Sequence, residues 1–434
     1  MRFDLLPAVS RRQVLRTLAA MAATSALPVA YARGKEHNKL SHQDEGFLDD
    51  LEKAGCLLFW EQGSPNTGQV LDRARYDLNG ARDPRRMASI AATGFGLTAL
   101  CIADKRGYLP HAPIVERVRT TLDWHLNKMP EVHGFFYHFT DIETGARWNK
   151  TELSPIDTSL LLCGVLTARE HFSDPHIKSL AQQIYARVDW PWMLNGGDTF
   201  AMAWGPEQGF HKGRWDHFCE LMMMYLLAIG SPSHPVPPET WNNFSRPVIQ
   251  FENYKYISGN DPLFTHQYAQ AWYDFRHKRD AYADYFENST IATRAHKAFC
   301  LSHPEWYSED YWGVSASDSA HGYHAWGGPP PKGPLDGTVV PCAAAGSLPF
   351  VPADCIAVLR SMRAKWGDRA WGRYGFVDAF HPAANWYDPD VLGIDQGISV
   401  VMAENLRSGF VWDTFMRNPE CVRAMQLVGF KSES

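Results

Sequence analysis

The stretch that decides the fold runs from Phe218 to Ile229 and reads FCELMMMYLLAI, with Glu220 as its only charged residue. Apolar residues on every side of a helical turn predict a helix that is buried all round. A carboxylate in such a helix loses water, so its protonated form is favoured and its pKa rises. Enzymes obtain a general acid at neutral pH in this way. A buried glutamate satisfied by an arginine or a backbone donor is the structural alternative, and this stretch alone leaves both open.

Two other stretches share this apolar character. Ser89 to Leu100 (SIAATGFGLTAL) and Leu160 to Leu166 (LLLCGVL) carry no charge and predict helices covered on all sides. The segments 112–129 and 176–188 carry a charge every few residues, which is typical of helices with one wet face. Alternating inner and outer helices predict an all-α fold, an (α/α)6 barrel built as a toroid of helical hairpins.

Helical patterns of ordinary length recur along the chain, and we expect helices at 42–58, 88–106, 112–129, 155–171, 176–188, 216–229, 262–288, 291–301, 351–364 and 394–406. Gly134 to Phe139 (GFFYHF) alternates weakly and predicts a short hairpin arm. The segment 302–350 is rich in Gly, Pro and aromatic residues and is too long for an idle connection. We expect it to shape one mouth of a single barrel domain that covers 42–430.

The N-terminal segment predicts export. Ser10 to Arg16 (SRRQVLR) is a twin-arginine pattern, followed by the weakly apolar Thr17 to Leu27 and the A-x-A site at Ala30 to Ala32. We expect a signal peptide over 1–32 and a periplasmic or secreted protein. Its removal takes away four arginines and one aspartate, a net +3, which changes the formal charge from −6 to −9. An acidic protein argues against nucleic acid or anionic membranes as partners, and no later stretch approaches a transmembrane span.

The sequence carries no familiar metal or nucleotide motif. The eight cysteines are scattered without CxxC or CxxH pairs, and no HExxH occurs among the eighteen histidines. A disulfide between Cys342 and Cys355 after export stays open, because spacing cannot establish it. Gly94 and Gly96 give GFG rather than GxGxxG, and no GxSxG is present. We therefore expect neither a zinc site nor a nucleotide site.

The aromatic content favours a carbohydrate site. Sixteen Trp and seventeen Tyr lie largely in Gly- and Pro-rich segments. Such rings present flat apolar faces with a hydrogen-bonding edge, which match the apolar faces and polar rims of sugars. About half of them are expected to be core or loop-packing residues. The rest predict an aromatic-lined cleft, with Trp204, Trp215 and Trp326 as stacking surfaces.

A second acidic motif precedes another apolar helix. In the stretch Thr151 to Thr158 (TELSPIDT), Ser154 suits an N-cap, Pro155 suits the first helical position, and Asp157 falls where a capping-box acid lies. Asp157 also suits the barrel mouth, so capping and catalysis both stay open. Glu152 lies on the loop before the cap, where residues tend to carry function, although a solvated glutamate is the plain alternative.

Two carboxylates at separate helix mouths suit glycosidic hydrolysis. One protonates the leaving oxygen and the other activates water. Glu220 and Glu152 meet only if both helix mouths open on one side of the barrel. Asp141 and Glu143 in HFTDIETG are expected in a turn near the cleft, and Asp318 in SASDS in an Asx-turn or cap. The residues expected to bind substrate are Arg73, Asp141, Trp204, Trp215, His217, Trp326, Asp395 and Gln396; for Asp395 capping is an equal alternative.

Several motifs together resemble a known family. They are FWEQGSPNTGQVLDR (59–73), SIAATGFGLTAL (89–100), ELSPIDTSLLLCGVL (152–166), the Glu220 run followed by AIGSPSHP, the stretch at Trp312-Gly313, DGTVVP (336–341) and GIDQG (393–397). They resemble the glycoamylase-like domain of glycoside hydrolase family 144, the bacterial endo-β-1,2-glucanases. The resemblance implies one (α/α)6 barrel, no cofactor, and inverting hydrolysis of linear or cyclic β-1,2-glucan to sophoro-oligosaccharides. By motif position Glu220 and Glu152 match family acids, whereas Pro155 departs from the expected pattern.

The sequence thus predicts an exported, monomeric, endo-acting β-1,2-glucan hydrolase. Glu220 is the expected general acid, Glu152 the expected activator of water, and Asp157 a third catalytic candidate that holds hydroxyl groups. A glucosidase or transglycosylase acting on another linkage is the alternative among enzymes. A periplasmic glucan-binding protein without activity is the alternative outside them, and the two intact acids argue against it.

Overall fold

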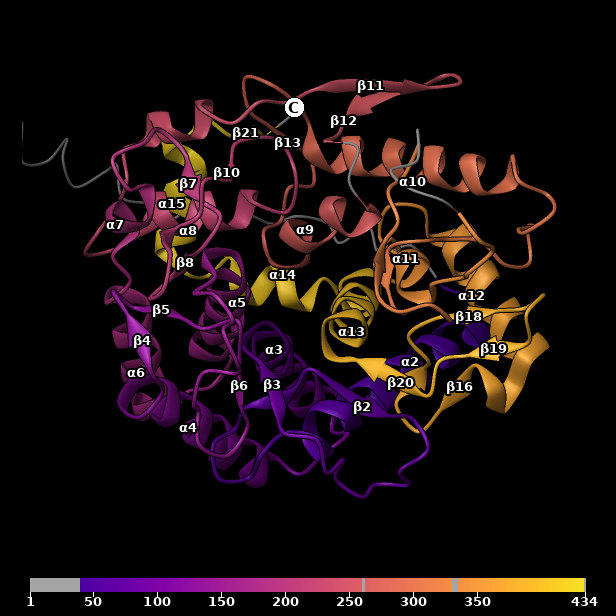
Figure 1. The fold of residues 1–434 in the computed structure, drawn as a ribbon, viewed down its shortest axis with the longest axis horizontal. Coiled ribbons are helices and arrows are strands. Elements are labelled where there is room, and N and C mark those ends of the chain that lie inside the picture. Colours follow the sequence, from indigo (N-terminus) through magenta and orange to yellow (C-terminus); the bar gives the residue numbers. More distant parts are fainter. Residues whose placement is uncertain (1–39, 260–261, 330–334, 433–434) are drawn as a thin grey trace, which may run out of the picture. The chain divides into compact units, whose positions relative to one another are not determined.

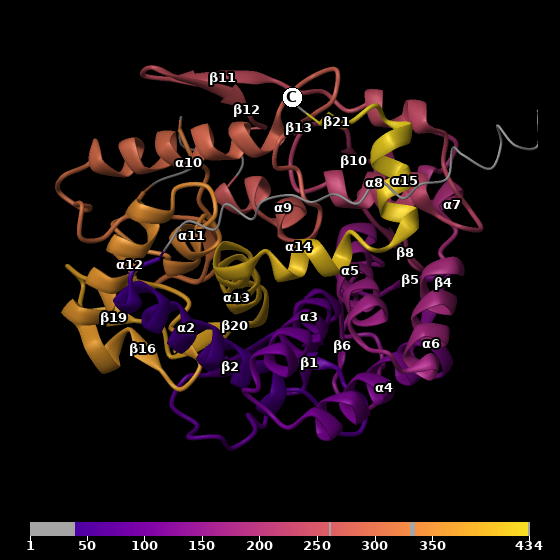
Figure 2. The same cartoon turned by 180° about the vertical axis from the view of Figure 1, so that it is seen from behind.

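Close approaches at two glycines bring three central helices together. The computed structural model describes residues 40–432 except 260–261 and 330–334 (Figures 1 and 2). A Cβ atom on Gly94 of α3 (Ile90–Arg106) would collide with the Leu160 carbonyl of α5 (Pro155–His171), and one on Gly397 of α13 (Gly393–Ser408) with the Phe95 ring. Each contact joins residues in the second turns of two helices. The three helices therefore run parallel, with their N-terminal ends on one side.

Six inner helices follow one another around the described part of the barrel, and six longer or more polar helices cover them (Figure 1). The inner helices are α3, α5, α8 (Met222–Gly230), α9 (Tyr268–Trp272), α11 (Pro341–Ala345) and α13. The outer helices are α2 (His42–Glu61), α4 (His111–Asn127), α6 (Pro175–Ala186), α10 (Tyr285–Leu301), α12 (Pro352–Trp366) and α15 (Pro419–Leu427). All nine residues of α8 are buried, whereas α4 buries only one face. The predicted (α/α)6 barrel is confirmed.

Short strands connect the segments that precede the inner helices. A three-stranded sheet joins β1 (Val70–Leu71), β3 (Met87–Ser89) and β6 (Phe139–Asp141), and β2 (Arg73–Arg75) pairs with β20 (Asp390–Leu392). Since β3 leads into α3 and β20 leads into α13, these pairings collect distant loops at one side. We call this side, at the N-terminal ends of the inner helices, the acidic end.

The opposite side, which we call the basal end, holds a buried charge network. Glu404 near the end of α13 contacts Lys105 and accepts from Arg106 Nε at 2.8 Å. Glu52 of α2 contacts Arg407 and accepts from the Tyr108 hydroxyl at 3.1 Å. Both glutamates are fully buried, and Arg106 Nε lies 3.7 Å from Glu52 Oε2. The C-terminal ends of α3 and α13 are thereby tied to α2.

The remaining elements are short and lie between the helices. The helical ones are α7 (Trp190–Leu194), α14 (Phe410–Phe415) and the 3-10 turns η1 (Pro238–Asn242), η2 (Leu263–His266) and η3 (Gly367–Arg369). The paired strands are β4 (Glu131–Val132) with β5 (Phe135–Phe136), β7 (Phe200–Ala201) with β10 (Arg214–Trp215), β8 (Trp204–Gly205) with β9 (Gly209–Phe210), β11 (Val248–Phe251) with β12 (Tyr254–Ile257), β13 (Lys278–Arg279) with β21 (Lys431–Ser432), β14 (Ala316–Ser317) with β15 (His324–Ala325), β16 (Trp371–Gly372) with β17 (Gly375–Phe376), and β18 (Phe380–His381) with β19 (Trp386–Tyr387).

Two predicted helices are wrong in their bounds. The helix expected at 216–229 begins only at Met222, because the preceding residues pair with Ser245 instead. The helix expected at 262–288 is broken: α9 ends at Trp272, and β13 then pairs with the C-terminal strand β21. Two of the missed helices, α14 and α15, follow α13. The hairpin arm expected at 134–139 corresponds to β5 and the start of β6.

Three other expectations concern export, membranes and cysteines. The predicted signal peptide at 1–32 lies outside the described residues. No helix in the described ranges has the length and apolar character needed to span a bilayer. Cys342 and Cys355 are both free and buried, so the open disulfide is not formed.

Candidate active site

Glu220 lies in the turn that leads into α8, at the acidic end. It is half-buried and precedes the first helical residue by two positions. Its carboxylate interacts with the phenol of Tyr268 at the start of α9. The prediction that Glu220 sits inside a fully buried helix is therefore wrong. Its exposure at a helix mouth is, however, what a proton donor to a bound substrate requires.

Glu152 and Asp157 lie on either side of one histidine. His138 Nδ1 is 2.9 Å from Glu152 Oε1, and its Nε2 is 3.5 Å from Asp157 Oδ1. The ring also stacks on Phe139 with centroids 3.8 Å apart. Burial disfavours the charged imidazole, but Asp157 and Glu152 outweigh it and raise the pKa of His138 to about 9. The hydrogen bond from His138 lowers the pKa of Glu152 to about 2.

Asp157 is also the predicted capping residue. Its backbone N–H donates to Ser154 Oγ at 3.2 Å, and the Ser154 hydroxyl donates to Asp157 Oδ2 at 2.5 Å. Pro155 is the first residue of α5. The capping interpretation is confirmed, and the contact with His138 shows that Asp157 faces the acidic end as well. A catalytic role for Asp157 stays a prediction.

A cluster of five aspartates occupies the same end, and we call it the acid cluster. Its members are Asp72 between β1 and β2, Asp318 after β14, Asp378 between β17 and β18, Asp388 between β19 and β20, and Asp395 in the first turn of α13. One carboxylate oxygen from each of Asp318, Asp378 and Asp388 lies within 4.8 Å of the others. Figure 1 shows β2 and β20 beside the start of α13, which is how these loops come together.

Arg73 contacts two members of the acid cluster. Its Nε donates to Asp72 Oδ2 at 3.1 Å, and its Nη1 contacts Asp318 Oδ2. Burial opposes the charge on Arg73, but Asp72 and Asp318 outweigh this effect and raise its pKa. Arg73 therefore lies at the acidic end as predicted, although its two contacts there are to protein carboxylates. Binding of substrate by Arg73 stays a prediction.

The other three aspartates are buried with incomplete hydrogen bonding. Asp378 and Asp388 are 3% exposed and Asp395 is 5% exposed. One oxygen of each has no donor within the described part of the chain. Burial raises the pKa of all three, and nearby carboxylates raise it further. Acids whose pKa is raised by burial and like charge are typical of functional sites.

Shared neighbours join these groups into one site. Tyr268 interacts with both Glu220 and Asp395. Tyr323, about half exposed on the β14–β15 hairpin, interacts with Asp395, Asp378 and Asp72. Asp72 also interacts with His138. Electrostatic interactions thus relate Glu220, the acid cluster and His138 at the acidic end. A direct meeting of Glu220 with Glu152 stays a prediction.

The predicted aromatic residues and His217 differ in accessibility. Trp204 and Trp215 are half-buried, and Trp204 pairs through its backbone with Leu153, just before α5. His217 is 44% exposed in its side chain and lies 3.2 Å from Asp216. Trp326 is only 4% exposed and packs in the main core. We therefore no longer propose that its ring stacks on a sugar.

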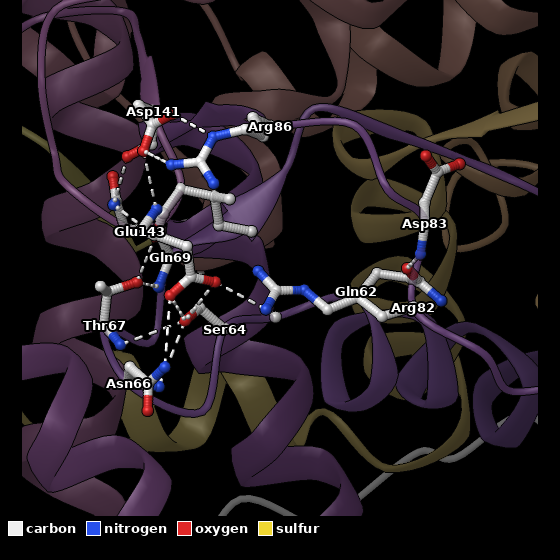
Figure 3. Close-up of polar contacts among 12 residues, drawn as sticks. Gln62, Ser64, Asn66, Thr67, Gln69, Arg82, Asp83, Arg86, Asp141 and Glu143 are labelled. Atoms are coloured by element: carbon white, nitrogen blue, oxygen red, sulfur yellow. Dashed lines mark hydrogen bonds and ion pairs between the residues drawn. The ribbon is translucent and has the colours of Figure 1, made fainter.

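Asp141 belongs to a separate polar network at the edge of the barrel (Figure 3). Both of its oxygens accept from Arg86, at 2.6 and 2.7 Å, and Oδ1 also accepts from the Glu143 and Thr144 backbone N–H groups. Burial opposes ionisation, but the hydrogen bonds from Arg86, Thr144 and Glu143 together outweigh it and lower the pKa of Asp141 to about 2. The expected turn is confirmed. Because both carboxylate oxygens of Asp141 already accept hydrogen bonds from these partners, we no longer propose that Asp141 binds substrate.

Gln396 is held by neighbouring protein groups. Its Nε2 donates to the Phe376 carbonyl at 2.5 Å, and its Oε1 faces the glycine side of α2 at Gly55. It is 4% exposed. Although Gln396 follows Asp395 directly, its side chain packs toward the outer helix α2. We therefore no longer propose that Gln396 binds substrate.

The acid cluster is also the one group of metal-type ligands among the residues the structure describes. Asp318 already contacts Arg73, and Asp378 accepts the Asp318 backbone N–H at 2.8 Å. These protein partners give no reason to assign a cation here. Two surface hollows lie elsewhere, between α2 and α12 and beside β13 and β21.

Sequence reasoning missed His138, Asp72, Asp378 and Asp388. A signal existed for Asp378, which stands alone in the apolar run FVDAF just as Glu220 stands alone in FCELMMM. The others gave none, because each becomes significant only through pairing of distant strands. Of the predicted residues, Glu220, Glu152, Asp157, Arg73 and Asp395 lie at the acidic end, in or beside the segments that precede the inner helices.

Residues 212–419 match the glycoamylase family model, described as "Putative glucoamylase". This range includes Glu220 and four members of the acid cluster. The chain is 29% identical over 432 residues to an exo-β-1,2-glucooligosaccharide sophorohydrolase (non-reducing end) from Parabacteroides distasonis. That match covers 89% of this chain but only 58% of the longer relative.

Two solved structures resemble the fold along nearly their whole length. A "putative glucoamylase" from Bacteroides uniformis has a TM-score of 0.83 at 27% identity and covers 91% of this chain and 98% of its own. An endo-β-1,2-glucanase from Chitinophaga pinensis, solved with sophorotriose and glucose, has a TM-score of 0.80 at 27% identity and covers 91% and 99%. The resemblance predicted from the motifs is confirmed.

Proposed function

We propose that this chain is a glycoside hydrolase that cleaves β-1,2-glucan to short β-1,2-linked oligosaccharides. The observation that carries the proposal is the set of acids at the N-terminal ends of the inner helices, where Glu220 lies half-buried before α8 and Asp395 lies buried in the first turn of α13. The names of the relatives supply the linkage. The longer relative contains more chain than this protein matches, so its activity is carried over here as a proposal.

Glu220 would act as the general acid. It lies at a helix mouth and is half-buried, so its side chain is open to a substrate while it keeps a partly desolvated setting. Glycosidic cleavage also needs an ionised carboxylate that activates water on the other side of the sugar. The two carboxylates available for that task are Glu152 and Asp395.

Asp395 suits the activation of water better than Glu152. Glu152 is held by His138, and a pKa of about 2 makes it a weak base at neutral pH. Burial and the neighbouring Asp318 and Asp72 raise the pKa of Asp395, which strengthens it as a base. Asp395 also shares Tyr268 with Glu220. We therefore assign water activation to Asp395, directly or through a substrate hydroxyl, and place Glu152 and Asp157 in positioning roles.

Action within the glucan chain, export and a monomeric state complete the proposal. Endo action follows the predicted family resemblance, and the twin-arginine pattern of the sequence supports a periplasmic or secreted location. Fractionation of cells for the full chain tests the location, and light scattering tests the monomer.

The proposal is tested by incubating the protein with purified linear and cyclic β-1,2-glucan and, in parallel, with β-1,3- and α-1,4-glucans. We expect reducing ends and short β-1,2-linked oligosaccharides from the first two substrates only, with inversion at the new anomeric carbon. Cleavage of cyclic glucan would establish endo action. Release of products from another linkage alone, or tight binding without any product, would overturn the proposal.

A further inference from the structure

The β14–β15 hairpin has one buried strand and one exposed strand. Both residues of β14 are buried, whereas every residue from 320 to 325 is exposed. This exposed segment reads AHGYHA and carries Tyr323, which is 52% exposed. Tyr323 and Tyr282 are the two large aromatic residues that stay exposed within the described part of the chain. A single exposed ring needs no explanation by itself, so its position decides whether it has a role.

The pairing of the hairpin gives the position of Tyr323. Asp318 follows the last residue of β14 and Tyr323 precedes the first residue of β15, so the two lie opposite each other. Beyond them, Ser319 and Gly322 exchange two backbone hydrogen bonds, at 2.9 and 3.1 Å, which close the turn. Directly opposite residues in an antiparallel pair carry neighbouring side chains on one face. Tyr323 is thereby placed beside Asp318, a member of the acid cluster.

Asp318 fixes this part of the hairpin to the acidic end. Its backbone N–H donates to Asp378 Oδ2 at 2.8 Å, and its carboxylate contacts Arg73. The segment that leads into β14 is also held, because the Val314 backbone N–H donates to His296 Nε2 of α10 at 3.0 Å. The exposed strand is therefore attached to a rigid support, which presents the Tyr323 ring at a defined place.

The electrostatic surroundings agree with this position. Burial and the carboxylates of Asp395, Asp378 and Asp72 raise the pKa of the Tyr323 phenol. The same residue is half exposed, so it is open to solvent and close to the acid cluster at once. An accessible aromatic face beside acidic groups suits a sugar, whose apolar face stacks on a ring while its hydroxyl groups bind carboxylates.

We propose that Tyr323 contacts the substrate and that its ring stacks on one glucosyl unit of the glucan. This inference rests on the proposed function and deepens it, because it identifies an aromatic contact that the sequence did not predict. Tyr323 takes no part in proton transfer, so it affects binding of the glucan and not the chemical step.

Steady-state kinetics on linear β-1,2-glucan tests the contact. Tyr323→Ala removes the ring and should raise KM by about tenfold with kcat within about threefold of the wild type, because the lost contact is made equally in the ground state and the transition state. Tyr323→Phe keeps the ring and should retain the wild-type KM. Tyr282→Ala is the matched control, since Tyr282 is 44% exposed in the segment between β13 and α10. Its KM should not change.

Direct binding gives a second readout, which a loss of folding would not reproduce. In the Glu220→Gln background, where we expect almost no turnover, adding Tyr323→Ala should weaken the binding of short β-1,2-linked glucooligosaccharides about tenfold in calorimetry. The thermal unfolding temperature should stay unchanged. An unchanged KM and affinity in Tyr323→Ala, or an equal loss in Tyr323→Phe, would overturn the inference.

The wild type distinguishes failure of this contact from failure of the proposed function. If the wild type cleaves β-1,2-glucan and Tyr323→Ala does so with the same KM, the contact alone is refuted. If the wild type neither binds nor cleaves β-1,2-glucan, the proposed function fails and the stacking contact fails with it.

Discussion

The two ends of the inner helices bury acids in opposite ways. At the basal end, Glu52 and Glu404 are fully buried, and three cations surround them: Lys105, Arg106 and Arg407. At the acidic end, Asp378, Asp388 and Asp395 are almost as buried, yet Arg73 contacts only their neighbours.

This difference distinguishes carboxylates that stabilise the fold from carboxylates that suit catalysis. Burial opposes ionisation of Glu404, but Arg106 and Lys105 outweigh it and lower its pKa. Even Glu52, whose pKa burial and Glu404 raise, keeps contacts with Arg407 and Tyr108. Asp378, Asp388 and Asp395 lack such compensation, so their pKa values rise, as expected where a protein keeps carboxyl groups ready for chemistry.

The largest expected effect is a loss of stability when a cation is removed from the basal end. Arg407→Met should lower the free energy of unfolding by about 3–5 kcal/mol, because it leaves Glu52 buried without its main partner. Urea denaturation at pH 7 measures the loss, and the rate per folded molecule should stay unchanged. Arg75→Met, which removes an exposed pair with Asp77, is the matched control and should lose much less. Equal losses would show that the basal network is not structural.

At the acidic end we expect that removing a charged group increases the free energy of unfolding. Burial raises the pKa of Asp388 to about 7, so protonated Asp388 contributes stability below about pH 4 that is lost as the pH rises through about 7. Asp388→Asn should therefore raise the free energy of unfolding at pH 8 by about 1–2 kcal/mol, since one pKa unit corresponds to about 1.4 kcal/mol. Its activity on glucan should fall. Loss of stability at pH 8 with normal activity would refute the distinction between the two ends.

The smallest effect concerns the histidine between Glu152 and Asp157. The raised pKa of His138 means that its contribution to stability is full below about pH 6.5 and lost as the pH rises through about 9. Denaturation at pH 6 and at pH 9.5 should show this decline in the wild type and a weaker decline in His138→Gln. The same decline in both proteins would mean that His138 is not held as an imidazolium.

Local pattern was sufficient for the elements that pack independently of distant partners. The uncharged run at Ser89 and the S-P-x-D start of α5 predicted buried helices, and both lie where expected. The run at Phe218 misled, because its first residues are as apolar as a helix interior but pair with Ser245. Periodicity cannot distinguish these outcomes.

The acid cluster was hidden for a different reason. Its five members come from five separated segments and meet only because β2 pairs with β20, more than 300 residues later in the chain. Asp388 looks like an ordinary turn residue in WYDPD. Only the burial and the missing donors, which no local pattern encodes, mark it as part of a site.

The central claim is that the acids at the acidic end carry out the hydrolysis. It is tested most directly by measuring kcat on linear β-1,2-glucan for the wild type, Glu220→Gln and Asp395→Asn, with the exposed Glu116→Gln as the matched control. Loss of a general acid or base predicts a fall of about 10² to 10⁴-fold in the first two variants, with folding intact, and no change in the control. Near-normal turnover in both Glu220→Gln and Asp395→Asn would contradict the account.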